Sequence, residues 1–181
     1  VVRGNLQAIL DDVYPLSKEE IGHLLEETHH LTRLVDDLHE LAQAEARQLP
    51  LYQQKTNIPV LVKEVVGVMR PTAVSHNITL QTEILGFIPK LEIDTARMRQ
   101  VLHNLLSNAL RHTPDGGRVL VRIEQNQNIV HIQVEDNGPG IPIDNYEDVF
   151  KPFFTLDPSR NKLKGESGLG MTIARDIIRS H

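Results

Sequence analysis

Hydrophobic residues recur at alternating spacings of three and four between residues 18 and 47, a pattern typical of a long amphipathic helix. The segment lacks proline, and Ser17 is a suitable N-cap in front of it. Leu25, Leu34 and Leu41 widen the apolar stripe beyond the narrow seam of a two-stranded coiled coil, so we expect a helical bundle. The stripe itself consists of Ile21, Leu24, Thr28, Leu31, Val35, Leu38 and Ala42.

A shorter helix is predicted upstream, where Val2, Leu6, Ile9 and Val13 repeat with the same period. The break at Tyr14-Pro15-Leu16 separates the two segments, so residues 1–47 are expected to form an antiparallel helical hairpin. One hairpin cannot cover both apolar stripes, which favours a dimeric four-helix bundle. Because the first arm starts without a cap, we expect the chain to be truncated upstream.

The pattern changes after Leu49-Pro50, and residues 48–56 are interpreted as a linker. Asn57 can cap a helix with Leu61, Val65 and Val68 facing inward, which Pro71 should end or bend. A strand is predicted next, with the alternating residues Ile78, Leu80, Thr82 and Ile84.

Asp94 is expected to cap a second helix of this part, which ends near Thr113-Pro114-Asp115-Gly116-Gly117. Its apolar face consists of Met98, Val101, Leu102, Leu105, Ala109 and Leu110. Two strands over residues 119–125 and 129–136 follow, and a final helix carries Ile173 and Ile177. The chain is therefore predicted to be α+β: a helical hairpin, then an α/β sandwich over residues 57–181 with helices on one face of an antiparallel or mixed sheet.

Composition narrows the functional classes. The 181 residues carry 24 Asp and Glu against 19 Lys and Arg, and the net charge of −5 argues against a basic nucleic-acid interface. The absence of cysteine excludes disulfides, thiol catalysis and thiolate zinc sites. No apolar run approaches the roughly 20 residues of a membrane span, so this segment is expected to be soluble, without direct membrane contact.

Asp136 is the first candidate for chemistry. Val130, Ile132 and Val134 share one strand face by their period of two, and the same parity places Asp136 on that apolar face. A buried carboxylate needs hydrogen-bond donors, and the glycines of the following Asn137-Gly138-Pro139-Gly140 would let a ligand approach the backbone. The alternative is a plain turn in which Asp136 caps its own backbone.

Asn104 and Asn108 lie four residues apart on an otherwise apolar helix, with Arg111 and His112 one turn later. Amide oxygens can bind a hard cation, and the Arg and His could contact phosphate oxygens, so the group suits a magnesium-bound triphosphate. The alternative is two exposed amides followed by favourable charges at a helix C-terminus.

Residues 165–170, Gly-Glu-Ser-Gly-Leu-Gly, lack the Lys-Ser/Thr of a P-loop and do not follow a strand, which excludes both common phosphate-binding fingerprints. A glycine-rich stretch before a helix still favours anions, and Arg160, Lys162 and Lys164 precede it. A histidine metal site is discounted, because His23 and His30 are seven residues apart and lack a His-x-x-x-His spacing.

Four motifs in fixed order carry a family resemblance. They resemble the N, G1, F and G2 boxes of sensor histidine kinases, and the likeness extends over residues 57–181. Residues 1–47 resemble the remainder of the dimerisation and phosphotransfer hairpin. The motifs are Asn104-Leu-Leu-Ser-Asn108-Ala-Leu-Arg111-His112-Thr113, Asp136-Asn-Gly-Pro-Gly140-Ile141, Val149-Phe150-Lys-Pro-Phe153-Phe154 and Gly165-Glu-Ser-Gly168-Leu-Gly170-Met171.

The resemblance implies a Bergerat-type fold that binds ATP with Mg²⁺. It implies that Asp136 accepts the adenine amino group, that Asn108 binds Mg²⁺ and that Asn104 assists phosphoryl transfer. It further implies that residues 142–168 form a mobile lid. The other expected nucleotide-binding residues are Arg111, His112, Gly138, Gly140, Ile141, Lys164, Gly165, Gly168, Leu169 and Gly170.

The implied function is the cytoplasmic kinase core of a membrane-anchored sensor, which phosphorylates a bundle histidine before a response regulator receiver domain takes the phosphoryl group. No His-Glu-Leu-Arg-Thr-Pro motif occurs, so this chain is not expected to phosphorylate itself. Thr155 stands where the family commonly has Arg, Pro71 is unexpected, and the chain is expected to stop before two further strands. The alternative function is a nucleotide-binding scaffold without transfer activity.

Overall fold

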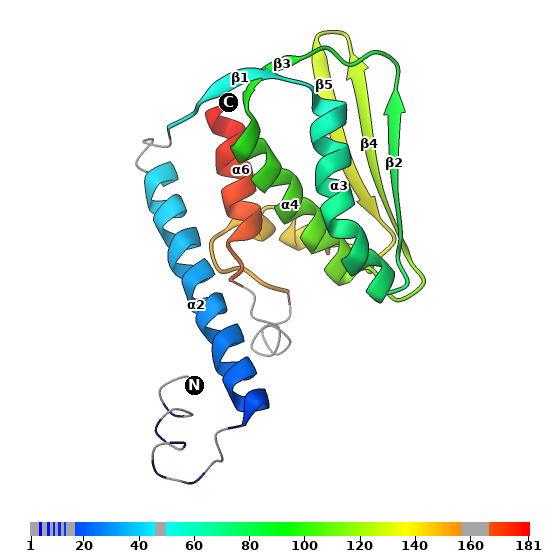
Figure 1. Ribbon diagram of the computed structural model, residues 1–181. Coiled ribbons are helices and arrows are strands. Elements are labelled where there is room, and N and C mark those ends of the chain that lie inside the picture. The colour runs from blue at the N-terminus through cyan, green and yellow to red at the C-terminus, as the bar shows by residue number, and fades with distance from the viewer. Residues whose placement is uncertain are drawn as a thin grey trace.

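The computed structural model describes residues 17–45, 50–156 and 167–181, together with Gly4, Gln7, Ile9, Asp11 and Val13 (Figure 1). A long helix lies beside a layered domain of helices and sheet. The predicted first arm of the hairpin falls mostly outside the described residues, as do Lys164 and Gly165. In chain order the helices and strands are α2 (Lys18–Glu45), β1 (Gln53–Thr56), α3 (Ile58–Ser75), β2 (Thr79–Leu85), β3 (Leu91–Asp94), α4 (Thr95–His112), β4 (Arg118–Asn126), β5 (Ile129–Asp136), the short 3₁₀ helices η1 (Ile143–Asn145) and η2 (Asp148–Phe150), and α6 (Gly170–Ser180).

The main sheet is mixed, in agreement with the predicted helix and sheet fold. Its strand order is β2-β4-β5, with β2 parallel and β5 antiparallel to the central strand β4. In the register, Val121 of β4 lies opposite Thr82 on one side and Val134 on the other. Parallel pairing of β2 with β4 requires a long crossover, which β3 and α4 supply.

A second, two-stranded sheet pairs β1 with β3 in antiparallel orientation. Residues 53–56, which form β1, lie within the segment that was expected to be a linker. The strand Gln53-Gln54-Lys55-Thr56 contains no hydrophobic residue, so hydrophobic alternation could not have revealed it.

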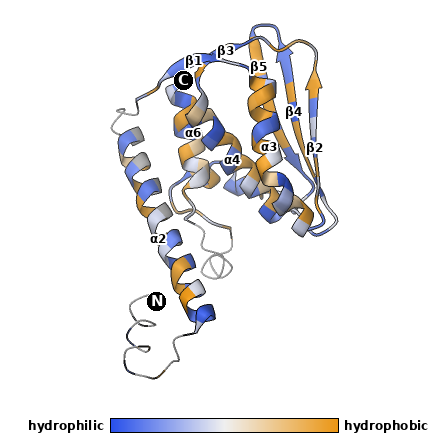
Figure 2. Ribbon diagram, viewed as in Figure 1, coloured by the Kyte–Doolittle hydropathy of each residue, from blue (hydrophilic) through white to orange (hydrophobic). Residues whose placement is uncertain are grey.

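Helices α3 and α4 cover one face of the main sheet with their hydrophobic sides, and α6 packs against α4 (Figures 1 and 2). Val119, Val121 and Ile123 of β4 are completely buried between the layers. Leu106 of α4 is also completely buried, although the sequence pattern placed the half-buried Leu105 on the apolar face instead. Each buried aliphatic side chain contributes about 1.5–3 kcal/mol, so this aliphatic core stabilises the layers without tryptophan.

Helix α3 differs from its prediction at two positions. Val68 is 71% exposed and Met69 is buried instead, because the buried face follows Leu61, Val62, Val65 and Val66. Pro71 does not end the helix, which continues to Ser75. Pro71 and Gly67 are both exposed, so the Gly67 carbonyl that loses its helical partner can bind water.

Helix α2 forms as predicted, with the Ser17 hydroxyl accepting a hydrogen bond from the Glu20 backbone N–H at 3.1 Å. It contacts α6, and Leu41 is the buried apolar residue among those α2 side chains that the structure describes. Much of the predicted stripe is exposed: Ile21, Leu25, Leu31, Val35 and Leu38 each have 45–64% of their surface accessible. Within the described part of the chain, no helix combines the length and apolar character that a membrane crossing requires.

Candidate functional site

The N-cap of α4 orients the helix that carries the N box. The Asp94 side chain accepts hydrogen bonds from the backbone N–H of Arg97 at 3.0 Å and of Tyr52 at 2.8 Å. Burial by itself raises the pKa of the Asp94 carboxyl, but these backbone donors outweigh it and hold the pKa below the ordinary value. The predicted cap therefore also connects α4 to the backbone just before β1.

Asn104 connects α4 to the start of α6. Its side-chain Nδ2 donates a hydrogen bond to the backbone carbonyl of Gly170, at 3.0 Å. The neighbouring Leu169 is completely buried, which holds the glycine-rich turn against the core. Two segments that the sequence separates by 66 residues thus meet at one site.

Asp136 ends β5 opposite Val119, on the core-facing side of the sheet that the period of two predicted. The expectation that its carboxylate is buried is wrong: the side chain is exposed, because Asp136 is the last residue of its strand. Its Oδ1 accepts a hydrogen bond from the Gly138 N–H at 2.9 Å, which is the turn geometry that formed the alternative interpretation. A second oxygen of this carboxylate remains available for a ligand donor.

Gly138 brings the end of β5 close to the end of α4. A Cβ atom at this position would lie 2.7 Å from the His112 carbonyl oxygen and 2.8 Å from Asp136 Oδ1. Any side chain would therefore push the Asp136 turn away from α4. Asn137 secures the same turn by accepting a hydrogen bond from the Arg118 N–H at 2.7 Å.

The F box packs on the start of α6. The Phe153 N–H donates to the Gly168 carbonyl at 3.1 Å, and both residues have left-handed backbone conformations, with φ of 62° and 65°. A Cβ on Gly168 would lie 2.9 Å from the Phe153 backbone, so glycine is required there. The Thr172 hydroxyl donates to the Phe150 carbonyl at 3.0 Å. This hydroxyl contact was missing from the sequence-based site.

The predicted site residues thus converge only in part. The structure brings Asn104 to Gly170 and places Gly138 against the backbone of His112. Asn108 is half-buried on the same helix as Asn104, whereas Arg111 and His112 are exposed at the helix end. Gly140, with φ of 73°, and the exposed Ile141 follow the Asp136 turn.

These groups fit a nucleotide with a hard cation. The exposed Asp136 carboxylate can accept from a base amino group, and the Asn108 amide oxygen is a suitable ligand for Mg²⁺. The N-terminus of α6 has no side-chain cap, so its backbone N–H groups and positive dipole end favour an anion. A histidine-based metal site gains no support, since no group of three His, Asp or Glu residues within the described ranges could hold an ion.

Comparison with known proteins gives a consistent picture. Residues 93–181 match the family described as "Histidine kinase-, DNA gyrase B-, and HSP90-like ATPase". The chain is 33% identical over 181 residues to the signal transduction histidine-protein kinase BaeS of Escherichia coli strain K12. The match covers all of this chain, which spans only 38% of that relative's length.

Solved structures of histidine kinases are also similar. The kinase AdeS of Acinetobacter baumannii matches with a TM-score of 0.83 and 26% identity, over 99% of this chain and 82% of that one. The catalytic domain of the kinase ThkA matches with a TM-score of 0.64 and 31% identity, over 71% of this chain and 80% of that one. ThkA in complex with the response regulator protein TrrA gives a TM-score of 0.70 and 25% identity, over 97% of this chain and 51% of that one.

Proposed function

Because this chain belongs to the sensor histidine kinases and contains their ATP-binding domain, we propose that it binds magnesium-ATP and supplies the kinase part of a two-component sensor. In the intact protein the γ-phosphoryl group would pass to a histidine of the helical bundle, and then to an aspartate of a response regulator. The ThkA complex with TrrA supports a response regulator as partner. One observation carries the proposal: Asn104 of the N box is hydrogen-bonded to Gly170 of the G2 box, so the two motifs form one site.

The individual roles follow from the chemistry of the residues. Asp136 would accept the adenine amino group, and Asn108 would hold Mg²⁺ through its amide oxygen. Arg111 and His112 would lie near the phosphates, where positive charge is stabilising. An amide at position 104 cannot accept a proton from water as a carboxylate can, which would keep futile hydrolysis slow.

The exposed hydrophobic side chains of α2 support a dimer formed through a helical bundle. We accordingly assign residues 1–47 to the dimerisation and phosphotransfer hairpin, residues 48–52 to the connection and residues 53–181 to the ATP-binding domain, since β1 pairs with β3 of that domain. Leu41 belongs to the same buried hydrophobic cluster as the core of the ATP-binding domain, so it would be the point where the hairpin meets that domain.

The proposal predicts that this chain binds ATP but does not transfer the γ-phosphoryl group to itself. The sequence contains no His-Glu-Leu-Arg-Thr-Pro motif, so incubation with γ-labelled ATP should leave no acid-labile, base-stable phosphoryl group on it, although calorimetry should detect ATP binding. A separately added bundle with its own histidine should be labelled weakly, because separate chains lack the effective concentration of a covalent connection. Failure to bind ATP would contradict the proposal, as would phosphohistidine on His23, His29, His30 or His39.

A further inference from the structure

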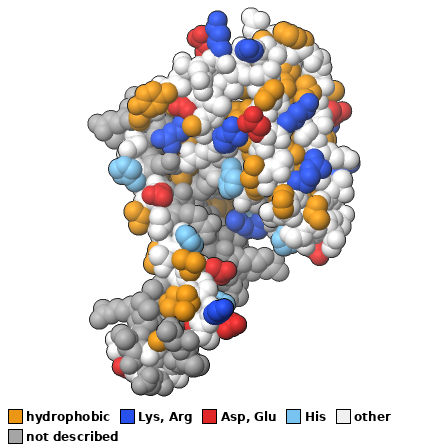
Figure 3. Space-filling model, viewed as in Figure 1, with side chains coloured by type: hydrophobic (Ala, Val, Ile, Leu, Met, Phe, Trp, Pro, Cys, Tyr) orange, Lys and Arg blue, Asp and Glu red, His pale blue; other side chains and the backbone are white. Residues whose placement is uncertain are grey.

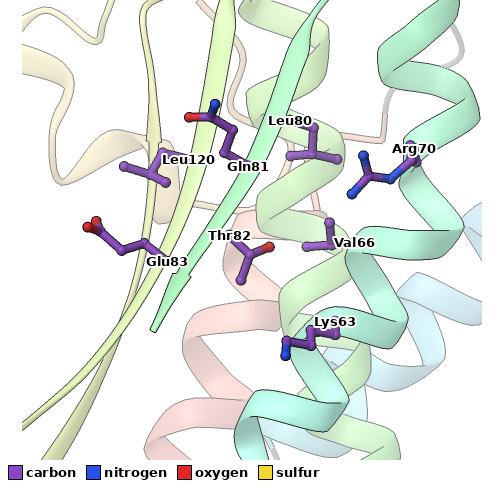
Figure 4. A pocket seen from close by; sticks show the side chains of 8 residues that line it. All are labelled: Lys63, Val66, Arg70, Leu80, Gln81, Thr82, Glu83 and Leu120. Atoms are coloured by element: carbon purple, nitrogen blue, oxygen red, sulfur yellow. The ribbon is translucent and has the colours of Figure 1, made fainter. Parts of the chain in front are cut away.

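A groove lies between α3 and the edge strand β2, away from the nucleotide site (Figure 4). It has a volume of about 760 Å³ and is open to solvent. Lys63, Val66 and Arg70 extend from α3 toward β2. The groove extends around both sides of strand β2. It is lined by the core-facing residues Leu80 and Thr82 of β2 and, on the outward side, by Gln81 and Glu83 of β2 and Leu120 of β4. We call this the β2 groove.

Strand β2 offers one row of backbone groups to the groove. Among the described strands, β2 pairs with β4 alone and so forms the edge of the sheet. The Thr79 N–H donates to the Gly117 carbonyl at 2.9 Å, on the β4 side. Successive N–H groups of a strand alternate in direction, so Thr79, Gln81 and Glu83 face β4, whereas Leu80, Thr82 and Ile84 face the edge. An unpaired row of this kind can accept another extended segment.

The charged side chains of the groove lining that have no ion-pair partner are positive. Neither Lys63 nor Arg70 has an ion-pair partner among the residues that the structure describes, and both side chains are exposed. The acidic residue of the lining, Glu83, is already paired with Arg122 at 2.8 Å. Figure 3 shows Lys and Arg side chains over the face of α3 and α4, with hydrophobic side chains between them. The net unpaired charge at the groove therefore complements an acidic partner.

We propose that the β2 groove binds an extended acidic segment of a partner protein, which adds a strand to the edge of β2. Lys63 and Arg70 are seven residues apart on α3, or about 10 Å, with Val66 between them. Alternate residues of an added strand face the same side, and positions four apart are separated by about 13 Å. The flexible Lys and Arg side chains span the difference, so the pattern Glu-x-Val-x-Glu fits: two acids on the cations and an apolar residue over the aliphatic parts of the Lys63 and Arg70 side chains, because Val66 itself is buried.

Binding of a labelled peptide to the 181-residue chain tests the proposal. The peptide Thr-Glu-Thr-Val-Thr-Glu-Thr should bind to the parent chain, and the same peptide with Gln in place of both Glu residues should bind about tenfold more weakly. The double variant Lys63→Gln with Arg70→Gln should also bind the original peptide about tenfold more weakly than the parent chain does. The matched control Lys55→Gln with Lys90→Gln, at two exposed lysines outside the groove, should bind normally. Equal affinity of both peptides, or equal loss in the control, would overturn the proposal. ATP affinity should not change in either variant.

Backbone pairing needs its own readout, because surface cations attract acidic peptides without a defined geometry. On peptide binding, amide hydrogen exchange should slow at Leu80, Thr82 and Ile84 and should stay unchanged at Thr79, Gln81 and Glu83. N-methylation of one alternate set of peptide nitrogens should abolish binding, while methylation of the other set should not. Uniform exchange, or equal loss with both sets, would contradict strand addition. Concentration-dependent dimerisation with the same exchange pattern and no peptide binding would identify a second copy as the occupant and overturn the proposal.

Discussion

The side-chain amide of Asn104 donates a hydrogen bond to the backbone carbonyl of Gly170, with 3.0 Å between nitrogen and oxygen. This bond joins the middle of α4 to the first residue of α6, where the F box also packs through Phe153 and Gly168. The N, F and G2 boxes are therefore joined by direct hydrogen bonds. A change at Asn104 should affect both the stability of this junction and the proposed transfer step.

We expect Asn104→Ala to lower the free energy of unfolding by about 1 kcal/mol, because one partly buried hydrogen bond is lost. ATP affinity should change little, whereas transfer to a supplied bundle histidine should fall, since the amide belongs to the proposed transfer machinery. Chemical denaturation, calorimetry and labelling measure the three quantities. His103→Ala, at the exposed neighbouring position, is the control and should leave transfer intact. Normal transfer in Asn104→Ala would contradict the assigned role.

The variant Asp136→Asn should lose ATP and ADP affinity by about one to two decades, because a base amino group would no longer meet a carboxylate acceptor. The fold should persist, since an Asn oxygen can still accept the Gly138 N–H that now bonds Asp136. Calorimetric titration measures the affinity, and circular dichroism checks the fold. The exposed Asp36→Asn removes the same charge from α2 and serves as control. Unchanged affinity in Asp136→Asn would exclude the adenine assignment.

Removal of the Asn108 side chain tests the metal assignment. Asn108→Ala should weaken nucleotide binding strongly with Mg²⁺ and only slightly with EDTA, because the change removes an oxygen ligand and leaves the base contacts intact. Titrations in the two buffers give the comparison, with Ser107→Ala as a neighbouring half-buried control. An equal loss in both buffers would mean that Asn108 has a structural role.

Asp94 should make the chain sensitive to acid. Its folded-state pKa is lowered by the backbone donors of Arg97 and Tyr52, so the ionised carboxylate stabilises the folded state. This contribution is fully present above the unfolded pKa of about 3.9 and is lost as the pH falls through the lower folded pKa. Asp94→Asn should therefore lose less stability than the parent chain on acidification from about pH 5 to about pH 2.

Urea denaturation at a series of pH values measures this difference. The exposed Asp115→Asn provides a variant with the same charge change, and it should follow the parent chain. If Asp94→Asn showed the same acid dependence as the parent, the cap would not account for the lowered pKa. Asn is itself a good N-cap, so both variants should fold at neutral pH.

Local patterns in the sequence were sufficient for most helices and strands. The cap residues Ser17, Asn57 and Asp94 each bond within their own first turn, and a bond between neighbours in sequence needs no knowledge of the rest of the chain. The period of two likewise predicted that Asp136 shares the core-facing side of β5. The four motifs indicated the family for the same reason, since they are short and contiguous.

Only the tertiary structure decided how those pieces meet. The polar strand β1 forms because β3 pairs with it, and the exposure of Asp136 depends on where β5 ends relative to the helical layer. The contacts of Asn104 with Gly170 and of Gly138 with His112 link residues that are far apart in the chain. Hydrophobic periodicity specifies which side of an element is buried but not its partner, because that choice depends on packing between distant segments.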